Sequence, residues 1–163
     1  MKSREIARYA LLTALALTLS WLESLFPIPG APPGVKLGLG NLAVIFALYR
    51  LGPKQAAGLS LVRVLLASAM FGSAYSLVYS LAGAAVSLLV MLGLKRTGRF
   101  SILGVSAAGG AGHNVGQILV AMAVLRSGYA AGYLPVLLVS GVSAGIAVGL
   151  AGGLVTKRVR LSG

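Results

Sequence analysis

The sequence predicts an all-α polytopic membrane protein with six transmembrane helices, a single integral membrane domain over residues 1–163, and both termini in the cytoplasm. The first observation is composition, because 58% of the residues are hydrophobic and only 10% are charged. No water-soluble domain of this size needs so much apolar surface. The second is that basic side chains fall in alternating crowded and sparse stretches. We therefore expect a multi-pass protein of a prokaryotic plasma membrane.

The basic residues set the predicted orientation, because loops rich in Lys and Arg are retained in the cytoplasm. Eleven of the 14 lysines and arginines lie in the crowded stretches: Lys2, Arg4, Arg8, Arg50, Lys54, Lys95, Arg96, Arg99, Lys157, Arg158 and Arg160. Lys36 and Arg126 stand alone in the sparse, external stretches. Despite the net charge of +12, we expect membrane lipid and no nucleic acid as the partner, since no basic stripe with interleaved aromatics is present.

The spans follow from the roughly 20 helical residues that a hydrocarbon core requires. In chain order they are predicted at residues 6–26, 37–51, 53–71, 73–94, 102–125 and 133–155. After the first span, residues 27–34 hold four of the six prolines and favour a stiff extended external loop. The second span is short, which indicates a tilted or partly buried helix. Pro53 starts the third span, where its missing N–H costs nothing.

Small residues recur at every fourth position of the last two spans. The stripes are Gly104, Ala108, Gly112 and Gly116, and then Gly141, Gly145, Gly149 and Gly153. Such stripes let helix backbones approach closely. They predict tight packing, either within one chain or between two chains.

Polar side chains inside the spans are the candidates for a site, because a charge at the bilayer centre normally faces a cavity or a partner. Arg63 lies ten residues into the third span, about 15 Å along the helix axis. The predicted substrate-binding residues are Glu23, Lys36, Asn41, Arg63, His113, Asn114 and Gln117. Counting from the helix ends places Glu23, Asn41 and Arg63 in the outer half and the three residues of the fifth span in its middle and outer part, with Lys36 in the loop immediately above. They form either a substrate pocket or a structural set of interhelical hydrogen bonds with an ion pair from Glu23 to Arg63 or Lys36.

Several reaction classes are excluded by composition. The chain has no aspartate and no cysteine, and its only acidic residues are Glu5 and Glu23. Paired carboxylates, Asp-rich magnesium sites, a catalytic triad and a Walker phosphate loop are therefore missing. His113 alone cannot hold a zinc ion. We expect binding or translocation, with no catalytic residue, no metal and no cofactor.

Four strings resemble one family: Pro-Gly-Val-Lys-Leu-Gly-Leu-Gly-Asn over residues 33–41, Val-Arg-Val-Leu-Leu over 62–66, Ser-Leu-Ala-Gly over 80–83 and His-Asn-Val-Gly-Gln over 113–117. They resemble the Gx transporter family, whose members are also labelled heptaprenyl diphosphate synthase component I. This family is similar in size and layout to the substrate-binding S-components of energy-coupling factor (ECF) transporters. The resemblance implies an S-component-like bundle, an outer-half site closed by the loop after the first helix, and docking on an ECF coupling subunit through Ala10 and Ala14, with ATP hydrolysis by separate ATPases.

Two functions remain open. The first is an S-component-like subunit that takes up a small polar or anionic, vitamin- or precursor-like solute. The second is a non-catalytic membrane partner of a prenyl (heptaprenyl) diphosphate synthase, or of a quinone- and flavin-based extracellular electron-transfer pathway. In the second, the basic loops at Lys95–Arg99 and Lys157–Arg160 would be the docking surface.

Overall fold

A computed structural model describes residues 3–25 and 38–159, and the regular structure within these ranges is entirely helical. The helices are α1 (Ser3–Leu25), α2 (Asn41–Arg50), α3 (Pro53–Phe71), α4 (Ala74–Thr97), α5 (Ile102–Leu125), the 3₁₀ helix η1 (Gly128–Tyr133) and α6 (Leu134–Arg158). Five of the described helices are long and apolar enough to cross a membrane, and α2 is the shorter apolar one. The predicted all-α, multi-pass membrane fold is confirmed at this level, and six full spans remain a prediction.

The observed ends of two helices agree with the ends predicted from the sequence. Helices α3 and α5 begin and end at the predicted residues. Helices α4 and α6 continue past the last apolar residue, to Thr97 and Arg158. Basic side chains are stabilising at the C-terminal end of a helix, where the helix dipole is negative. A run of basic residues therefore does not stop these two helices. Gly98, with a φ of 67°, ends α4 in the left-handed region.

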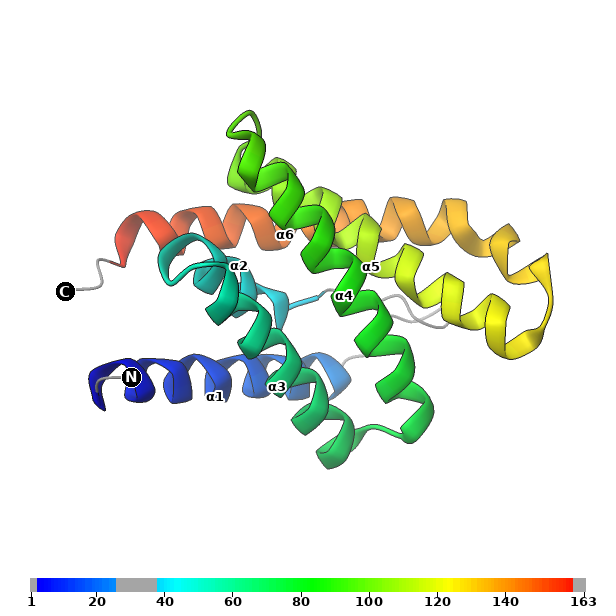
Figure 1. Cartoon of the computed structure of the whole chain (residues 1–163), viewed down its shortest axis with the longest axis horizontal. Helices are drawn as coiled ribbons and strands as arrows, with labels where there is room; N and C mark the ends of the chain where they lie inside the picture. Colours follow the sequence, from blue (N-terminus) through cyan, green and yellow to red (C-terminus); the bar gives the residue numbers. More distant parts are fainter. Residues whose placement is uncertain (1–2, 26–37, 160–163) are drawn as a thin grey trace.

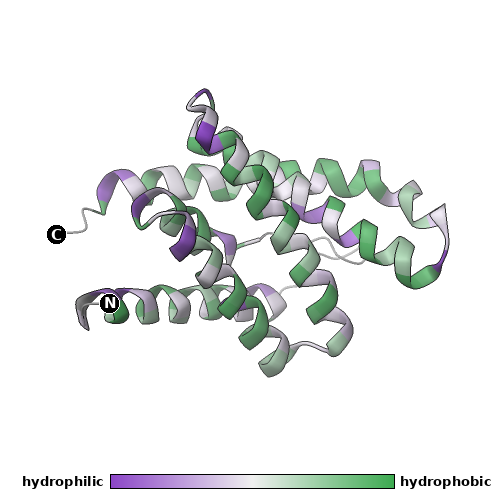
Figure 2. Ribbon diagram, viewed as in Figure 1, coloured by the Kyte–Doolittle hydropathy of each residue, from purple (hydrophilic) through white to green (hydrophobic). Residues whose placement is uncertain are grey.

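Helix α2 is shorter than predicted, because it begins only at Asn41. It is nevertheless at the centre of the core, with Ile45, Leu48 and four neighbouring side chains buried. The start of α1 and the end of α6 lie on the side of the bundle where α2 joins α3, as Figure 1 shows. Figure 2 shows apolar residues along most of every long helix and a hydrophilic interruption in the middle of α5.

Both glycine stripes make contacts within one chain: the α6 stripe packs against α5, whereas Gly112 and Gly116 of the α5 stripe face α4. A Cβ atom added to Gly110 would lie 2.0 Å from the carbonyl oxygen of Gly141, and one added to Gly145 would lie 2.5 Å from that of Ser106. Gly116 meets α4 in the same way, 2.5 Å from the carbonyl oxygen of Ala82. These backbones touch directly, as small residues permit. Gly153 is different, because a methyl group added there would have no neighbouring atom within 4 Å.

Two basic side chains fasten α2 to its neighbours at the end of the bundle where α1 starts and α6 ends. Lys95 of α4 donates to the carbonyl of Leu48, and its ammonium lies 4.8 Å from the centre of the Tyr49 ring. Arg50 of α2 donates to the carbonyl of Thr156 in α6. The last carbonyls of a helix have no partner in their own helix and carry partial negative charge, so cations suit them. Lys95 and Arg50, which the sequence analysis used to predict orientation, therefore also hold helices together.

The close α5–α6 contact predicts that Gly145→Ala is destabilising. Its methyl group would need Ser106 or Ala107 to move, and such overpacking costs about 1–3 kcal/mol. The same change at Gly153 is the matched control and should be neutral or stabilising by up to about 1 kcal/mol, since Ala favours helix more than Gly. Unfolding of both variants in mixed detergent micelles measures the difference. Equal free energies of unfolding for the two variants would show that the α5–α6 contact has room for a methyl group at position 145.

Candidate functional site

Arg63 joins three helices in the interior of the bundle. Its Nη2 donates to the side-chain oxygen of Asn41 in α2 at 3.0 Å, and its Nη1 donates to the hydroxyl of Ser20 in α1 at 3.3 Å. Its Nε is buried and has no hydrogen-bond partner within residues 3–25 and 38–159. One donor of this cation is thus left for a further acceptor.

The register of the α2–α3 hairpin explains why Arg63 meets Asn41. Only Leu51 and Gly52 connect the two helices. Asn41 lies nine residues before the end of α2, and Arg63 lies ten residues after Pro53 at the start of α3. At 1.5 Å per residue, both are about 14–15 Å from the turn and hence at the same depth.

Gly40 makes room for the guanidinium group at the start of α2. A Cβ atom at this position would lie 2.3 Å from the hydroxyl oxygen of Ser20 and 2.6 Å from Nη1 of Arg63. The cation therefore lies almost on the backbone of the residue that precedes α2. Any larger residue at this position would push Arg63 away from its partners.

Glu23 supplies the negative charge of the site. One of its carboxylate oxygens accepts the backbone N–H of Gly38 at 2.5 Å, and the carboxylate interacts electrostatically with Arg63. Gly38 has a φ of 74°, a conformation that favours glycine, and its carbonyl accepts the N–H of Asn41 at 2.8 Å. Glu23 thus ties the C-terminal end of α1 to the chain that enters α2.

The start of α2 adds positive potential beside Arg63. Gly40 is the N-cap residue and no side chain caps this helix end. The N–H groups of Asn41 and Leu42 donate to the carbonyls of Gly38 and Leu39. The helix start nevertheless carries partial positive charge, and such a position recurs as an anion site in transporters with short interior helices. The arrangement combines one full cation, one helix N-terminus and one carboxylate, and it can accept an anion.

The three predicted residues of α5 divide between two neighbouring helices. His113 packs on α4, where a Cβ atom at Gly83 would lie 2.8 Å from Cε1 of its ring. The side-chain amide of Asn114 donates to the carbonyl of Leu137 at 2.5 Å and so fastens α5 to α6. Gln117 is buried, and its side-chain oxygen has no hydrogen-bond partner in the described part of the chain.

Of the predicted site residues, the structure thus brings Glu23, Asn41 and Arg63 together. Lys36 and the proline-rich segment lie outside the described residues. Sequence reasoning did not identify Ser20, because one serine in an apolar helix is not unusual. The spacing of about one helical turn from Ser20 to Glu23 is the signal that could have identified it.

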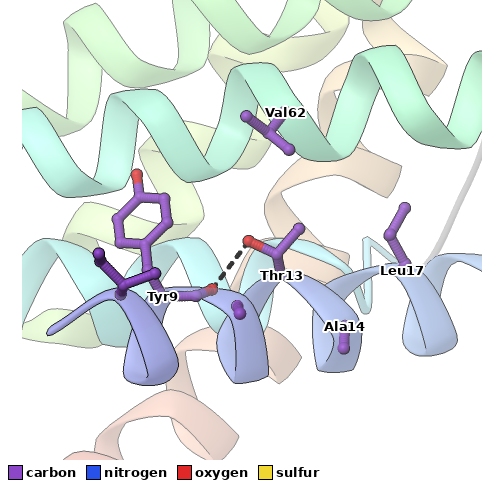
Figure 3. Close-up of a pocket in the computed structure, with 7 residues that line it drawn as sticks. Tyr9, Thr13, Ala14, Leu17 and Val62 are labelled. Carbon is purple, nitrogen blue, oxygen red and sulfur yellow. Dashed lines mark hydrogen bonds between the residues drawn. The ribbon is translucent and has the colours of Figure 1, made fainter. Parts of the chain in front are cut away.

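Ala10 and Ala14, the residues expected to dock a partner helix, line an apolar groove of about 470 Å³ between α1 and α3. Ile6, Tyr9, Thr13, Leu17 and Val62 complete the lining. Figure 3 shows Tyr9, Thr13 and Leu17 pointing from α1 toward α3, with Val62 facing them. The hydroxyl of Thr13 donates to the carbonyl of Tyr9 at 2.9 Å, so the groove offers little polarity.

Within the described ranges, no three His, Cys, Asp or Glu side chains gather to form a metal site.

A family of known proteins matches most of the chain. The family is described as heptaprenyl diphosphate synthase component I, and its model matches residues 12–155. No curated protein and no solved structure matches the chain.

The crowding around Gly40 predicts that Gly40→Ala is destabilising and that Ser20→Ala relieves part of the loss. The added methyl group collides with the Ser20 hydroxyl and with Arg63, and removing the hydroxyl leaves only the second clash. We expect a coupling of about 0.5–3 kcal/mol between the two changes, as for residues in direct contact. Free energies of unfolding of the two single variants, the double variant and the parent measure it.

Gly93→Ala is the matched control, because nothing lies within 4 Å of that position. Strictly additive effects of Gly40→Ala and Ser20→Ala would show that the two residues do not compete for the same space.

Proposed function

The chain belongs to the heptaprenyl diphosphate synthase component I family, and on that premise we propose that it is a membrane-embedded binding subunit for a small anionic or polar solute. The solute would bind between α1, α2 and α3 and pass inward. This is the S-component-like role, in which a separate coupling subunit and ATPases supply the energy and Ala10 and Ala14 contact the coupling subunit.

One observation carries the proposal: the Arg63 guanidinium lies against Gly40, at the uncapped start of a short interior helix. A cation placed at the positive end of a helix is electrostatically unfavourable unless negative charge is near. Glu23 provides one carboxylate, and that carboxylate also accepts a hydrogen bond from Gly38. An arginine with a purely structural role does not need the positive start of α2 beside it. An anion-binding site uses both the guanidinium and the helix start.

The chain's residues would divide the work of binding. Arg63 would contact the anion through Nε, while Asn41 and Ser20 hold the guanidinium in place through Nη2 and Nη1. Glu23 would keep the α2 start in position through Gly38. Lys36 would add a second cation, and His113 and Gln117 would add hydrogen bonds if the solute extends toward α5.

Arg63→Gln is expected to weaken binding of inorganic diphosphate, used as a simple anionic probe, by at least about tenfold. The change removes the cation and keeps a shorter, polar amide side chain, and loss of a buried charged partner is costly. Equilibrium dialysis of purified protein in lipid nanodiscs measures the affinity. Arg126→Gln, at an exposed arginine after α5, is the matched control, and equal loss in both variants would reject a site at Arg63.

The family description favours a second candidate, in which the protein recruits a prenyl diphosphate synthase to the membrane. The observation that supports it is the exposure of Arg96, Arg99, Lys157 and Arg158 after or within the last turns of α4 and α6. Arg50 and Lys95 do not belong to this surface, since both bond to carbonyls of other helices. The exposed basic ends would contact an acidic surface of the synthase.

A variant with four Gln substitutions, at Arg96, Arg99, Lys157 and Arg158, should recruit the synthase at least about tenfold less well than the parent. High salt should lower recruitment by the parent to a similar extent, because salt screens the charges. Co-sedimentation of the synthase with proteoliposomes measures it. Lys54→Gln, at another exposed lysine, is the control, and protease accessibility of the termini verifies orientation. Recruitment that survives both neutralisation and high salt would exclude an electrostatic docking surface.

A further inference from the structure

Glu23 is the carboxylate that the chain places beside the Arg63 site. The other acidic residue of the chain, Glu5, lies in the first turn of α1, about 27 Å away along the helix axis. Glu23 is partly buried. Ionisable side chains at membrane depth commonly mark the paths of ions and protons. The sole carboxylate of the site is therefore a candidate for binding a proton as well as for holding structure.

The position of Glu23 on α1 makes its negative charge unfavourable. It lies in the last turn of α1, which ends at Leu25 and contains no basic residue. The C-terminal end of a helix carries partial negative charge, which disfavours a carboxylate. The hydrogen bond from the Gly38 N–H can form in either protonation state, because a carboxylic acid keeps a carbonyl oxygen that accepts. The charged form of Glu23 thus depends on a nearby cation.

Arg63 is that cation. The two side chains interact electrostatically, and Ser20, one helical turn before Glu23, accepts from Nη1 of Arg63 at 3.3 Å. Helix α1 packs against α2 and α3. The other charged residues of those two helices, Arg50 and Lys54, lie beside the α2–α3 turn, about 14 Å below Arg63 along α3. Among the described residues of α2 and α3, only Arg63 is a charged group at this depth.

An anion bound to Arg63 would make two negative groups share one guanidinium. When like charges share a site, protonation of one of them is favoured. The effect is strong where water is scarce, because charges interact more strongly in a medium of low dielectric constant. Glu23 is the group that would take up the proton, since it loses part of its counter-ion and already lies at the negative end of a helix.

We propose that Glu23 is a proton-binding site coupled to the anion site, so that the protein binds its anionic solute together with one proton. This rests on the proposed anion site and adds the ion that is bound with the solute. The coupling is reciprocal, because a proton on Glu23 must favour the anion as much as the anion favours the proton. An anion that travels with a proton also carries less net charge into the apolar bundle.

The experiment measures binding of radiolabelled sulfate to the full chain in phosphatidylcholine nanodiscs between about pH 5 and pH 8. The charge of sulfate and that of the lipid are constant over this range, so any pH dependence comes from the protein. In the parent, the affinity should fall by about tenfold for each unit of rising pH wherever one proton is taken up per anion. In Glu23→Gln the affinity should be nearly independent of pH. At about pH 8 it should exceed that of the parent by at least about tenfold, because the neutral amide resembles the protonated acid.

Glu5→Gln is the matched control, because it removes the other carboxylate of the chain at the opposite end of α1. It should keep the pH dependence of the parent. An equal loss of pH dependence in Glu5→Gln and Glu23→Gln would overturn the proposal. Loss of pH dependence in His113→Gln, with Glu23→Gln behaving like the parent, would assign the proton to the imidazole and would overturn it too.

A second measurement does not depend on any variant. Sulfate is added to the parent in weakly buffered solution at several pH values, and a pH indicator dye reports the protons taken up. We expect uptake of close to one proton per sulfate bound in the range where the affinity depends on pH. Sulfate binding without proton uptake at any pH would overturn the proposal even if Glu23→Gln failed to fold, and would leave Lys36 as the cation that balances the anion.

The remaining outcomes separate this inference from the anion site. If Arg63→Gln weakens sulfate binding while the parent takes up no proton, the anion site stands and the coupling is wrong. If Arg63→Gln leaves sulfate binding unchanged, both are wrong. If the parent binds no sulfate at any pH in the range, an oxyanion site at Arg63 is rejected together with the coupling.

Discussion

A guanidinium group buried in an apolar bundle is the constraint on which this structure depends. Unpaired charge within a membrane is expensive, so Arg63 requires acceptors at its own depth. The structure provides them from two other helices, as Asn41 and Ser20, with Glu23 nearby. Helix α2 begins just after Gly38, whose φ of 74° interrupts helical backbone, and this places Gly40 and Asn41 against the guanidinium.

Sequence reasoning predicts the depth of each polar residue and cannot predict its direction around the helix axis. Counting from Pro53 and from Arg50 predicts that Arg63 and Asn41 share a level, and they are hydrogen-bonded. The same counting places His113 and Asn114 beside them. These two residues are offset by about 100° on α5, so one packs on α4 and the other bonds to α6. Rotation about the axis is set by tertiary packing, which a periodic pattern of small and apolar residues determines only in part.

The helices are not held equally firmly. Helices α4, α5 and α6 touch through glycine positions where no methyl group fits, so they cannot slide without separating. Helix α1 has one fully buried hydrophobic side chain, Ala16, among its described residues, and its hydrogen bonds with α3 lie near its two ends. Only 11% of its most apolar 18-residue stretch is buried, compared with 33% for α5. The candidate site and the groove thus both adjoin the loosely held helix α1 and lie apart from the glycine contacts among α4, α5 and α6.

The sign of the ligand follows from the charges around the site. Arg63 contributes one positive charge and Glu23 one negative charge, and the start of α2 adds about half a positive charge. A cationic ligand would have to compete with Arg63 for Glu23 and would face the positive end of α2. An anion would instead accept a hydrogen bond from the Arg63 Nε, which lacks a partner among the residues that the structure describes, and would lie opposite the positive helix end.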